Sequence, residues 1–133
     1  MDNQDSQALL QAQHDWYAAI NAMLQGDPKP FAEIYSHTDD ASYLSAGGGF
    51  CVGWSDIWAD WQAQAAAATG GQVELEESHI NIIDSTAIIQ MISTGKVNDF
   101  TGIAHSIRVR ETSVYRLVQG AWKMIAHQAD NLS

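Results

Sequence analysis

The chain has 133 residues, of which 46% are hydrophobic and 17% are charged, a composition typical of one folded globular domain. Its 16 acidic residues outnumber the 6 basic ones, so the formal net charge is −10 at pH 7. A nucleic-acid-binding domain needs a basic face, and an anionic membrane repels an acidic surface, so we expect no nucleic acid and no membrane among the partners. Cys51 is the one cysteine, which excludes an internal disulfide and a cysteine-based zinc site.

Motifs typical of cofactor-binding and exported proteins are missing from the sequence. The five histidines show no metal-binding spacing, and the glycines at 47–49 are not followed by the lysine of a phosphate-binding loop. We therefore expect no metal and no organic cofactor. Residues 2–6 lack the pattern of a signal peptide, and no apolar run approaches the roughly 20 residues that span a bilayer. These patterns predict a cytoplasmic protein.

Helical periodicity marks the beginning of the chain. Apolar residues recur every three or four positions over residues 9–24, which predicts an amphipathic helix that ends at Gly26. A short second helix is expected to begin at Asp27-Pro28, since proline is favoured in a first helical turn. The pattern then changes to that of a strand hairpin, which reverses at the glycines of residues 47–49.

A third helix is expected after this hairpin. Gly53 precedes it, and Ser55 is the predicted N-cap because a serine hydroxyl can accept a hydrogen bond from a free backbone N–H of the first turn. Trp58, Trp61 and Ala65 recur at helical spacing. The pattern therefore predicts that Trp58 lies in the middle of a buried stripe.

The rest of the chain has the alternation of strands. They are expected at residues 73–83, 87–94, 105–118 and 121–130. Three helices followed by a run of antiparallel strands place the chain in the α+β class. Apolar residues of the last two strands fall on both faces of the sheet, and three helices can cover only one face. The sequence therefore predicts a homodimer in which a second copy covers the other face.

The closing hairpin, residues 110–130, reads RETSVYRLVQGAWKMIAHQAD. Its Arg-x-Thr-x-Val-aromatic pattern, its Gly-x-Trp turn and the polar end of its last strand resemble the nuclear transport factor 2-like superfamily. The hairpin is most similar to the SnoaL-like and ketosteroid-isomerase-like group, and to the association domain of calcium/calmodulin-dependent kinases. The order of the expected elements agrees with this superfamily over nearly the whole chain.

This resemblance implies a single SnoaL-like domain over residues 1–133. Its expected fold is cone-shaped and cystatin-like, with three early helices packed on a curved antiparallel sheet. The resemblance also implies an apolar pocket at the open end of the cone, and dimerisation through the convex face of the sheet.

Several aromatic and titratable side chains are candidates to line such a pocket. Tyr35 and Trp58 belong to an aromatic helical cover that either packs in the core or lines the pocket. Tyr17 is predicted to point its hydroxyl into the cavity, where it and Arg110 opposite could hold an oxyanion or enolate. His105 begins a strand near the expected mouth of the cone, and it is our best candidate for a titrating pocket residue and a possible catalytic one.

Two further charged features have alternative interpretations. Asp39 is either a solvated turn residue or a catalytic carboxylate, with His37 on the same side if this segment is extended. Four of the six basic residues lie within residues 108–123. They either balance acids on neighbouring strands, or one or two of them face inward to hold an anionic or carbonyl-bearing ligand.

Pairing across the turn at residues 119–120 decides which side chains of the closing hairpin face the pocket. A two- or four-residue loop places Thr112 opposite His127, whereas a three-residue loop places Arg110 opposite Gln128. A shift of one residue exchanges His127 for Gln128 on the pocket face. The resemblance favours the three-residue loop, with Arg110, Thr112 and Gln128 facing inward.

Three functions are compatible with these patterns. The first is a pocket that binds a small apolar molecule and carries out cofactor-free acid–base chemistry, such as isomerisation, dehydration or cyclisation. The second is a binding or scavenging domain with the same pocket and no turnover. The third is a non-catalytic association domain. We favour a small-molecule ligand in the pocket, with the protein itself as the other partner.

Overall fold

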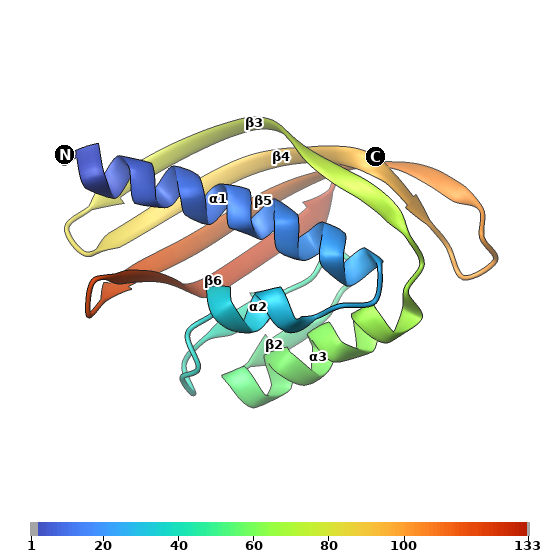
Figure 1. Ribbon diagram of the computed structural model, residues 1–133, viewed down its shortest axis with the longest axis horizontal. Helices are drawn as coiled ribbons and strands as arrows, with labels where there is room; N and C mark the ends of the chain where they lie inside the picture. The colour runs from blue at the N-terminus through green and yellow to red at the C-terminus, as the bar shows by residue number, and fades with distance from the viewer. Residues whose placement is uncertain (1–2, 133) are drawn as a thin grey trace.

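The computed structural model describes residues 3–132, and within them the chain forms three helices and one six-stranded curved sheet (Figure 1). The elements are α1 (Asn3–Leu24), α2 (Lys29–Ile34), β1 (Ser42–Leu44), β2 (Phe50–Val52), α3 (Trp54–Ala67), β3 (Gly71–Ile83), β4 (Thr86–Asn98), β5 (Ala104–Val118) and β6 (Ala121–Asn131). The strand order is β2-β1-β6-β5-β4-β3, and every neighbouring pair is antiparallel except β1 with β6. The expected α+β architecture is confirmed. No helix in this part of the chain is long and apolar enough to cross a membrane.

Helix α1 lies across the concave face of the sheet (Figure 1). Its buried residues Leu9, Trp16, Ala19 and Met23 recur at helical spacing and form the centre of the core. The helix ends where predicted, because Gly26 adopts a φ of 104° and its N–H donates to the carbonyl of Met23 at 2.9 Å.

Helix α3 differs from the prediction in its start and in its buried stripe. Its N-cap is Gly53, two positions before Ser55, and no side chain caps it. The buried residues are Ile57, Trp61 and Ala65, at a spacing of four. Trp58 lies one position, about 100°, away from this stripe, and it is half-buried with its ring stacked 5.4 Å from that of Trp54. The prediction that Trp58 is a central core residue is therefore wrong, and Trp61 has that place.

The two faces of the sheet have different environments. Alternate residues of β4 and β5 face the helices and are buried: Ala87, Ile89, Met91, Ser93, Glu111, Ser113 and Tyr115. The intervening residues form the face that no described helix covers, which we call the open face: Ile88, Gln90, Ile92, Arg110, Thr112 and Val114. The open face thus mixes half-buried apolar side chains with exposed polar ones.

The closing hairpin contains a two-residue turn and a β-bulge. Gln119 and Gly120 both have positive φ, 52° and 81°, the backbone of a tight turn between β5 and β6. The pairing Tyr115↔Met124 is followed by Val114↔Ala126, so one residue of β6, at position 125, has no partner on β5.

This bulge reverses the faces of β6 beyond it. On the C-terminal side of the bulge in β6, Gln128 pairs with Thr112, and His127 pairs with Ser113. The three-residue loop with Arg110 opposite Gln128 is therefore wrong. Because successive residues of a strand point to opposite faces, the extra residue places His127 inward and Gln128 outward.

Candidate functional site

A cavity of about 470 Å³ lies between the helices and the covered face of the sheet. This volume is in the range of sites that bind drug-sized molecules. Its walls are largely apolar and aromatic, with polar side chains from five elements and the β1–β2 turn: Tyr43, Ser45, Asp60, Gln64, Ser93, Glu111 and His127. Within residues 3–132, no lysine or arginine lines the cavity.

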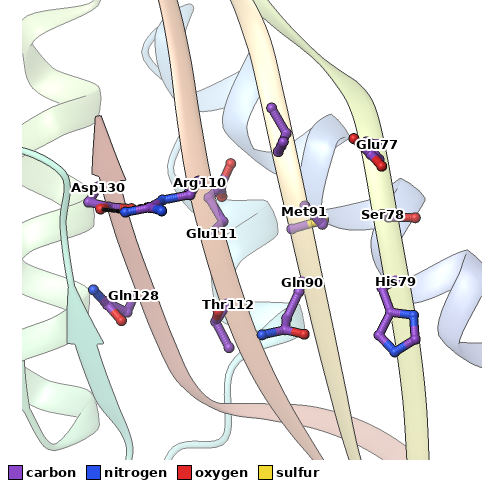
Figure 2. A pocket seen from close by; sticks show the side chains of 11 residues that line it. Glu77, Ser78, His79, Gln90, Met91, Arg110, Glu111, Thr112, Gln128 and Asp130 are labelled. Atoms are coloured by element: carbon purple, nitrogen blue, oxygen red, sulfur yellow. Dashed lines mark hydrogen bonds and ion pairs between the residues drawn. The ribbon is translucent and has the colours of Figure 1, made fainter. Parts of the chain in front are cut away.

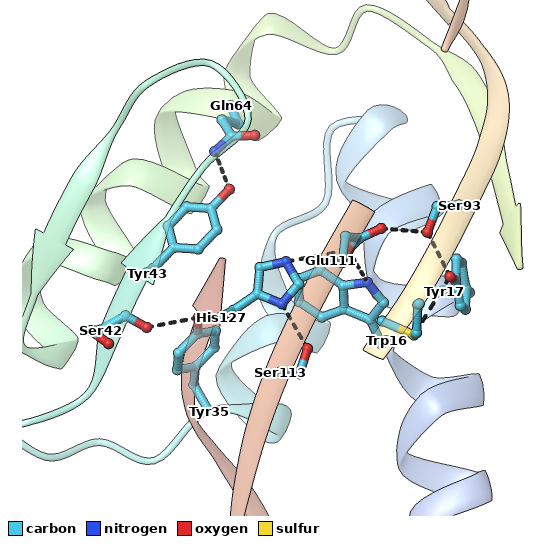
Figure 3. Close-up of polar contacts among 11 residues, drawn as sticks. Trp16, Tyr17, Tyr35, Ser42, Tyr43, Gln64, Ser93, Glu111, Ser113 and His127 are labelled. Atoms are coloured by element: carbon cyan, nitrogen blue, oxygen red, sulfur yellow. Dashed lines mark hydrogen bonds and ion pairs between the residues drawn. The ribbon is translucent and has the colours of Figure 1, made fainter. Parts of the chain in front are cut away.

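Glu111 is the most buried carboxylate of this cavity, with 8% of the residue exposed. The indole N–H of Trp16 donates to its Oε2 at 3.2 Å, and the hydroxyl of Ser93 donates to its Oε1. His127 Nε2 lies 3.2 Å from Oε2 (Figure 3). A buried carboxylate is costly unless donors compensate for its lost water, and here three side chains surround it.

His127 is fixed in position by contacts on both ring nitrogens. Its Nδ1 lies 2.7 Å from the hydroxyl of Ser113, and its Nε2 faces Glu111. Its ring centroid is 4.3 Å from that of Trp16, and only 3% of the residue is exposed. The imidazole can therefore exchange a proton with the carboxylate without changing its orientation.

A hydrogen-bond chain connects Glu111 to helix α1. The hydroxyl of Tyr17 lies 2.6 Å from Ser93 Oγ. Because Ser93 gives its own proton to Glu111, Tyr17 is the donor in this pair. Burial raises the pKa of Tyr17 above its ordinary value, so its hydroxyl keeps its proton at neutral pH. The carboxylate is thus held by a chain of neutral donors.

A second polar cluster is formed by α3 and β1. Gln64 Nε2 donates to Asp60 Oδ2 at 2.7 Å and to the hydroxyl of Tyr43 at 3.2 Å (Figure 3). Burial raises the pKa of Tyr43, so this hydroxyl is also a neutral donor. Trp61 stacks on Phe31 at 3.6 Å and on Tyr43 at 4.6 Å between ring centroids. Its indole Nε1 is buried and has no hydrogen-bond partner within the described residues.

A family model for the SnoaL-like domain matches residues 9–129. This chain belongs to the SnoaL-like family. Among the curated proteins, no sequence matches this SnoaL-like domain significantly. Its solved neighbours are similar in fold at low sequence identity.

One similar structure is a Streptomyces avermitilis protein described as a candidate dehydratase of the nuclear transport factor 2-like family, with TM-score 0.85 and 18% identity over 99% of each chain. Another is an uncharacterised Caulobacter vibrioides protein with a cystatin-like fold, with TM-score 0.79 and 18% identity over 96% of this chain and 89% of the other. A third, from Xanthomonas campestris, is described as a candidate calcium/calmodulin-dependent kinase II association domain, with TM-score 0.74 and 19% identity over 99% and 89%. These similarities show the fold that this SnoaL-like domain shares with them.

Three of the predicted pocket residues lie on the open face instead of in the cavity. Arg110, Thr112 and Gln128 are on neighbouring strands in a shallow polar trough, with Gln90 beside them (Figure 2). Arg110 is 62% exposed and makes a bidentate ion pair with Asp130, at 2.6 and 3.2 Å. This arginine lowers the pKa of Asp130, and its charge is balanced within the sheet. Arg110 and Thr112 face outward because they alternate with the buried Glu111 and Ser113 on β5, and the bulge in β6 is the reason why Gln128 joins them.

The remaining predicted residues lie outside the cavity wall as well. His105 is exposed near the β4–β5 loop, with its Nε2 2.7 Å from Asp99 Oδ2. Asp39 is exposed on the segment before β1. Tyr35 is buried and donates to the carbonyl of Ser42 at 3.3 Å. Of the predicted set, which also includes Trp58, Tyr17 alone joins the network around Glu111.

Part of the site was visible in the sequence and part was not. In β5, Ile107, Val109 and Tyr115 share the covered face with Glu111 and Ser113, so two polar residues interrupt an apolar alternation. That interruption is a signal for a buried polar site. No comparable signal marks the inward position of the histidine on β6, because it depends on the bulge.

Within residues 3–132, no group of three histidine, cysteine, aspartate or glutamate side chains is placed to hold a metal ion. The cavity residues themselves offer two carboxylates, an imidazole, an amide, and neutral hydroxyl and indole donors.

Proposed function

We propose that this SnoaL-like domain binds a small apolar molecule in the helix–sheet cavity and carries out acid–base chemistry on it, with Glu111 as the proton acceptor. The observation that carries the proposal is the placement of a buried carboxylate in the cavity wall beside a fixed imidazole. Carboxylates in apolar surroundings are typical general bases, because they are poorly solvated and have a defined orientation.

The geometry around Glu111 supports a division of roles. Its Oε2 accepts from Trp16 and lies beside His127 Nε2, whereas its Oε1 accepts from Ser93 and keeps a free lone pair. A substrate proton can be transferred to that lone pair. His127 then orients the carboxylate and compensates for charge as the proton moves, and it is a positioning residue.

Removal of a proton from carbon beside a carbonyl group is the first step of many isomerisations, dehydrations and cyclisations. The structural similarity to the Streptomyces avermitilis candidate dehydratase is compatible with dehydration as one member of this set. The cavity volume of about 470 Å³ fits a molecule of one to three rings.

We also propose that the domain is a homodimer through the open face. Ile88, Ile92 and Val114 are half-buried there, and no described helix covers them. Their polar neighbours Arg110 and Asp130 form an ion pair within one chain. Dimerisation through this face therefore buries no uncompensated charge at these two residues.

The proposed chemistry can be tested without knowing the natural substrate. In deuterated buffer, a base near a bound ketone exchanges the protons beside its carbonyl, and NMR follows the exchange. We propose 2-tetralone as the probe, with Glu111→Gln as the test variant and Glu33→Gln, exposed on α2 away from the cavity and the open face, as the matched control. General-base catalysis is worth about 100- to 10,000-fold, so Glu111→Gln should lose at least about 100-fold of the catalysed rate.

Glu33→Gln should exchange the probe as fast as the unaltered protein. Exchange that is no faster than in buffer, or that is equally fast in Glu111→Gln, would overturn the assignment of Glu111 as base. Binding of 2-tetralone without any exchange would instead favour the non-catalytic ligand-binding function.

A further inference from the structure

We infer that the ligand of the helix–sheet cavity carries a protonated amine, which binds the carboxylate of Asp60. This inference rests on the proposed function and extends it by naming the charge of the ligand. It follows from the charges that line the cavity and from the hydrogen-bonding groups that remain free there.

The cavity contains two carboxylates and, among its described lining residues, one imidazole, that of His127, which faces Glu111 and not Asp60. Asp60 and Glu111 both line it, and none of the described lining residues is a lysine or arginine. Four of the six basic side chains have partners outside the cavity: Arg108, Arg110, Arg116 and Lys123. The whole chain has a formal net charge of −10, which adds a long-range field in the same direction. An anionic ligand is therefore disfavoured, and a cationic one is favoured.

The two carboxylates differ in how many donors they already have. Glu111 is approached by Trp16, Ser93 and His127. Asp60 accepts one hydrogen bond, from Gln64 to Oδ2, and no donor among the described residues approaches its Oδ1. The capacity to bind an added donor therefore lies at Asp60, which is half-buried on α3.

Trp61 provides an independent indication that the cavity receives a ligand. It is 1% exposed, it lines the cavity, and its indole N–H has no acceptor. Phe31 and Tyr43 stack on its ring, which leaves the ring edges, one of which carries this N–H, for further contacts. A buried donor without an acceptor is unfavourable, and a neutral oxygen of the ligand would satisfy it. An amino ketone has both groups, and its carbonyl is also what the chemistry of Glu111 requires.

Three rigid aryl ketones that differ in one substituent can test this inference. They are 4-(aminomethyl)acetophenone, 4-(hydroxymethyl)acetophenone and 4-acetylbenzoate, which are cationic, neutral and anionic at pH 7. We expect the amine to bind about tenfold tighter than the alcohol at low salt, because hydrogen bonds to charged groups exceed neutral ones in strength. The carboxylate should bind most weakly, and added salt should reduce the preference for the amine.

Asp60→Asn and Asp56→Asn form a matched pair of variants on α3. Both remove one negative charge, but Asp56 is exposed and does not line the cavity. Asp60→Asn should reduce the ratio of amine to alcohol affinity to about one, whereas Asp56→Asn should leave it nearly unchanged. Circular dichroism of both variants checks that they fold.

The indole resonances of the five tryptophans report where the compounds bind. Trp16 and Trp61 line the cavity, and the other three tryptophans do not. Movement of these two resonances shows that the compounds enter the cavity. If the amine then binds no tighter than the alcohol, or still binds tighter in Asp60→Asn, the inference is wrong while the pocket proposal stands. If no compound moves them, the inference is also wrong, and the exchange experiment with 2-tetralone judges the proposed function separately.

Discussion

Replacing Glu111 by alanine should destabilise the fold far more than an ordinary strand substitution. The change removes the acceptor of Trp16 and Ser93 and the carboxylate beside His127; Ser93 keeps Tyr17 as a partner, and His127 keeps Ser113. The indole of Trp16 is 1% exposed, so its N–H is left without an acceptor and without water. An unpaired buried donor costs about 1–3 kcal/mol, and the one methylene that alanine lacks adds about 0.8 kcal/mol. We therefore expect the free energy of unfolding to fall by about 2–4 kcal/mol.

Urea unfolding followed by tryptophan fluorescence measures this loss. With a dependence on denaturant of about 1.5 kcal/mol per molar urea, the midpoint should fall by about 1.3–2.7 M. Glu111→Gln keeps the volume and one acceptor oxygen, so it should lose about half as much. Glu33→Ala, exposed on α2, should stay within about 0.5 kcal/mol of the unaltered protein. If Glu111→Ala and Glu33→Ala unfold at the same midpoint, the network around Glu111 does not exist as described.

Three other predictions follow from burial and from the open face. Trp61→Ala should cost about 3–5 kcal/mol of unfolding free energy, and Trp58→Ala only about 1–2 kcal/mol, as measured by urea unfolding; the reverse order would contradict the assignment of the α3 stripe. Burial raises the pKa of all four tyrosines, so they stay protonated in the folded state. The tyrosines of the unfolded chain ionise near pH 10, and the free energy of unfolding should therefore fall as pH rises above that value. Tyrosinate absorbance should then appear together with loss of circular dichroism, and separate earlier ionisation would argue against their burial. Light scattering after size exclusion should give twice the mass of one chain and a monomer for Ile88→Glu; a monomeric unaltered protein would remove the homodimer proposal.

The fold could be predicted from local rules because each rule acts within a few residues. The end of α1 at Gly26 and the strand alternation of β5 follow from a glycine with positive φ and from a period of two. The pattern predicts Ser55 as the N-cap of α3, where the structure has Gly53, and it predicts Trp58 beside Trp61 and Ala65 in the buried stripe, where the structure has Ile57. Trp58 is the direct neighbour of Ile57, and both positions are compatible with a helical repeat that includes Trp61 and Ala65. Packing in the folded protein therefore decides which of the two is buried.

The candidate site could be predicted less well because it depends on one irregularity. The turn at Gln119 and Gly120 alone pairs Thr112 with His127, but the bulge near Ile125 moves the pairing to Gln128. A bulge is stabilised by its neighbours in the sheet and leaves no fixed pattern in the sequence of one strand. Every side chain of β6 beyond it therefore points to the face opposite to the one that unbroken alternation from Met124 predicts.

The most direct test of the account is an electron-density map of crystals soaked with 2-tetralone. The account predicts density inside the cavity, with a carbon beside the ketone about 3–3.5 Å from Glu111 Oε1 and no density in the trough of the open face. Density beside Arg110 and Gln128, with an empty cavity, would contradict the account and return the site to the open face of the sheet.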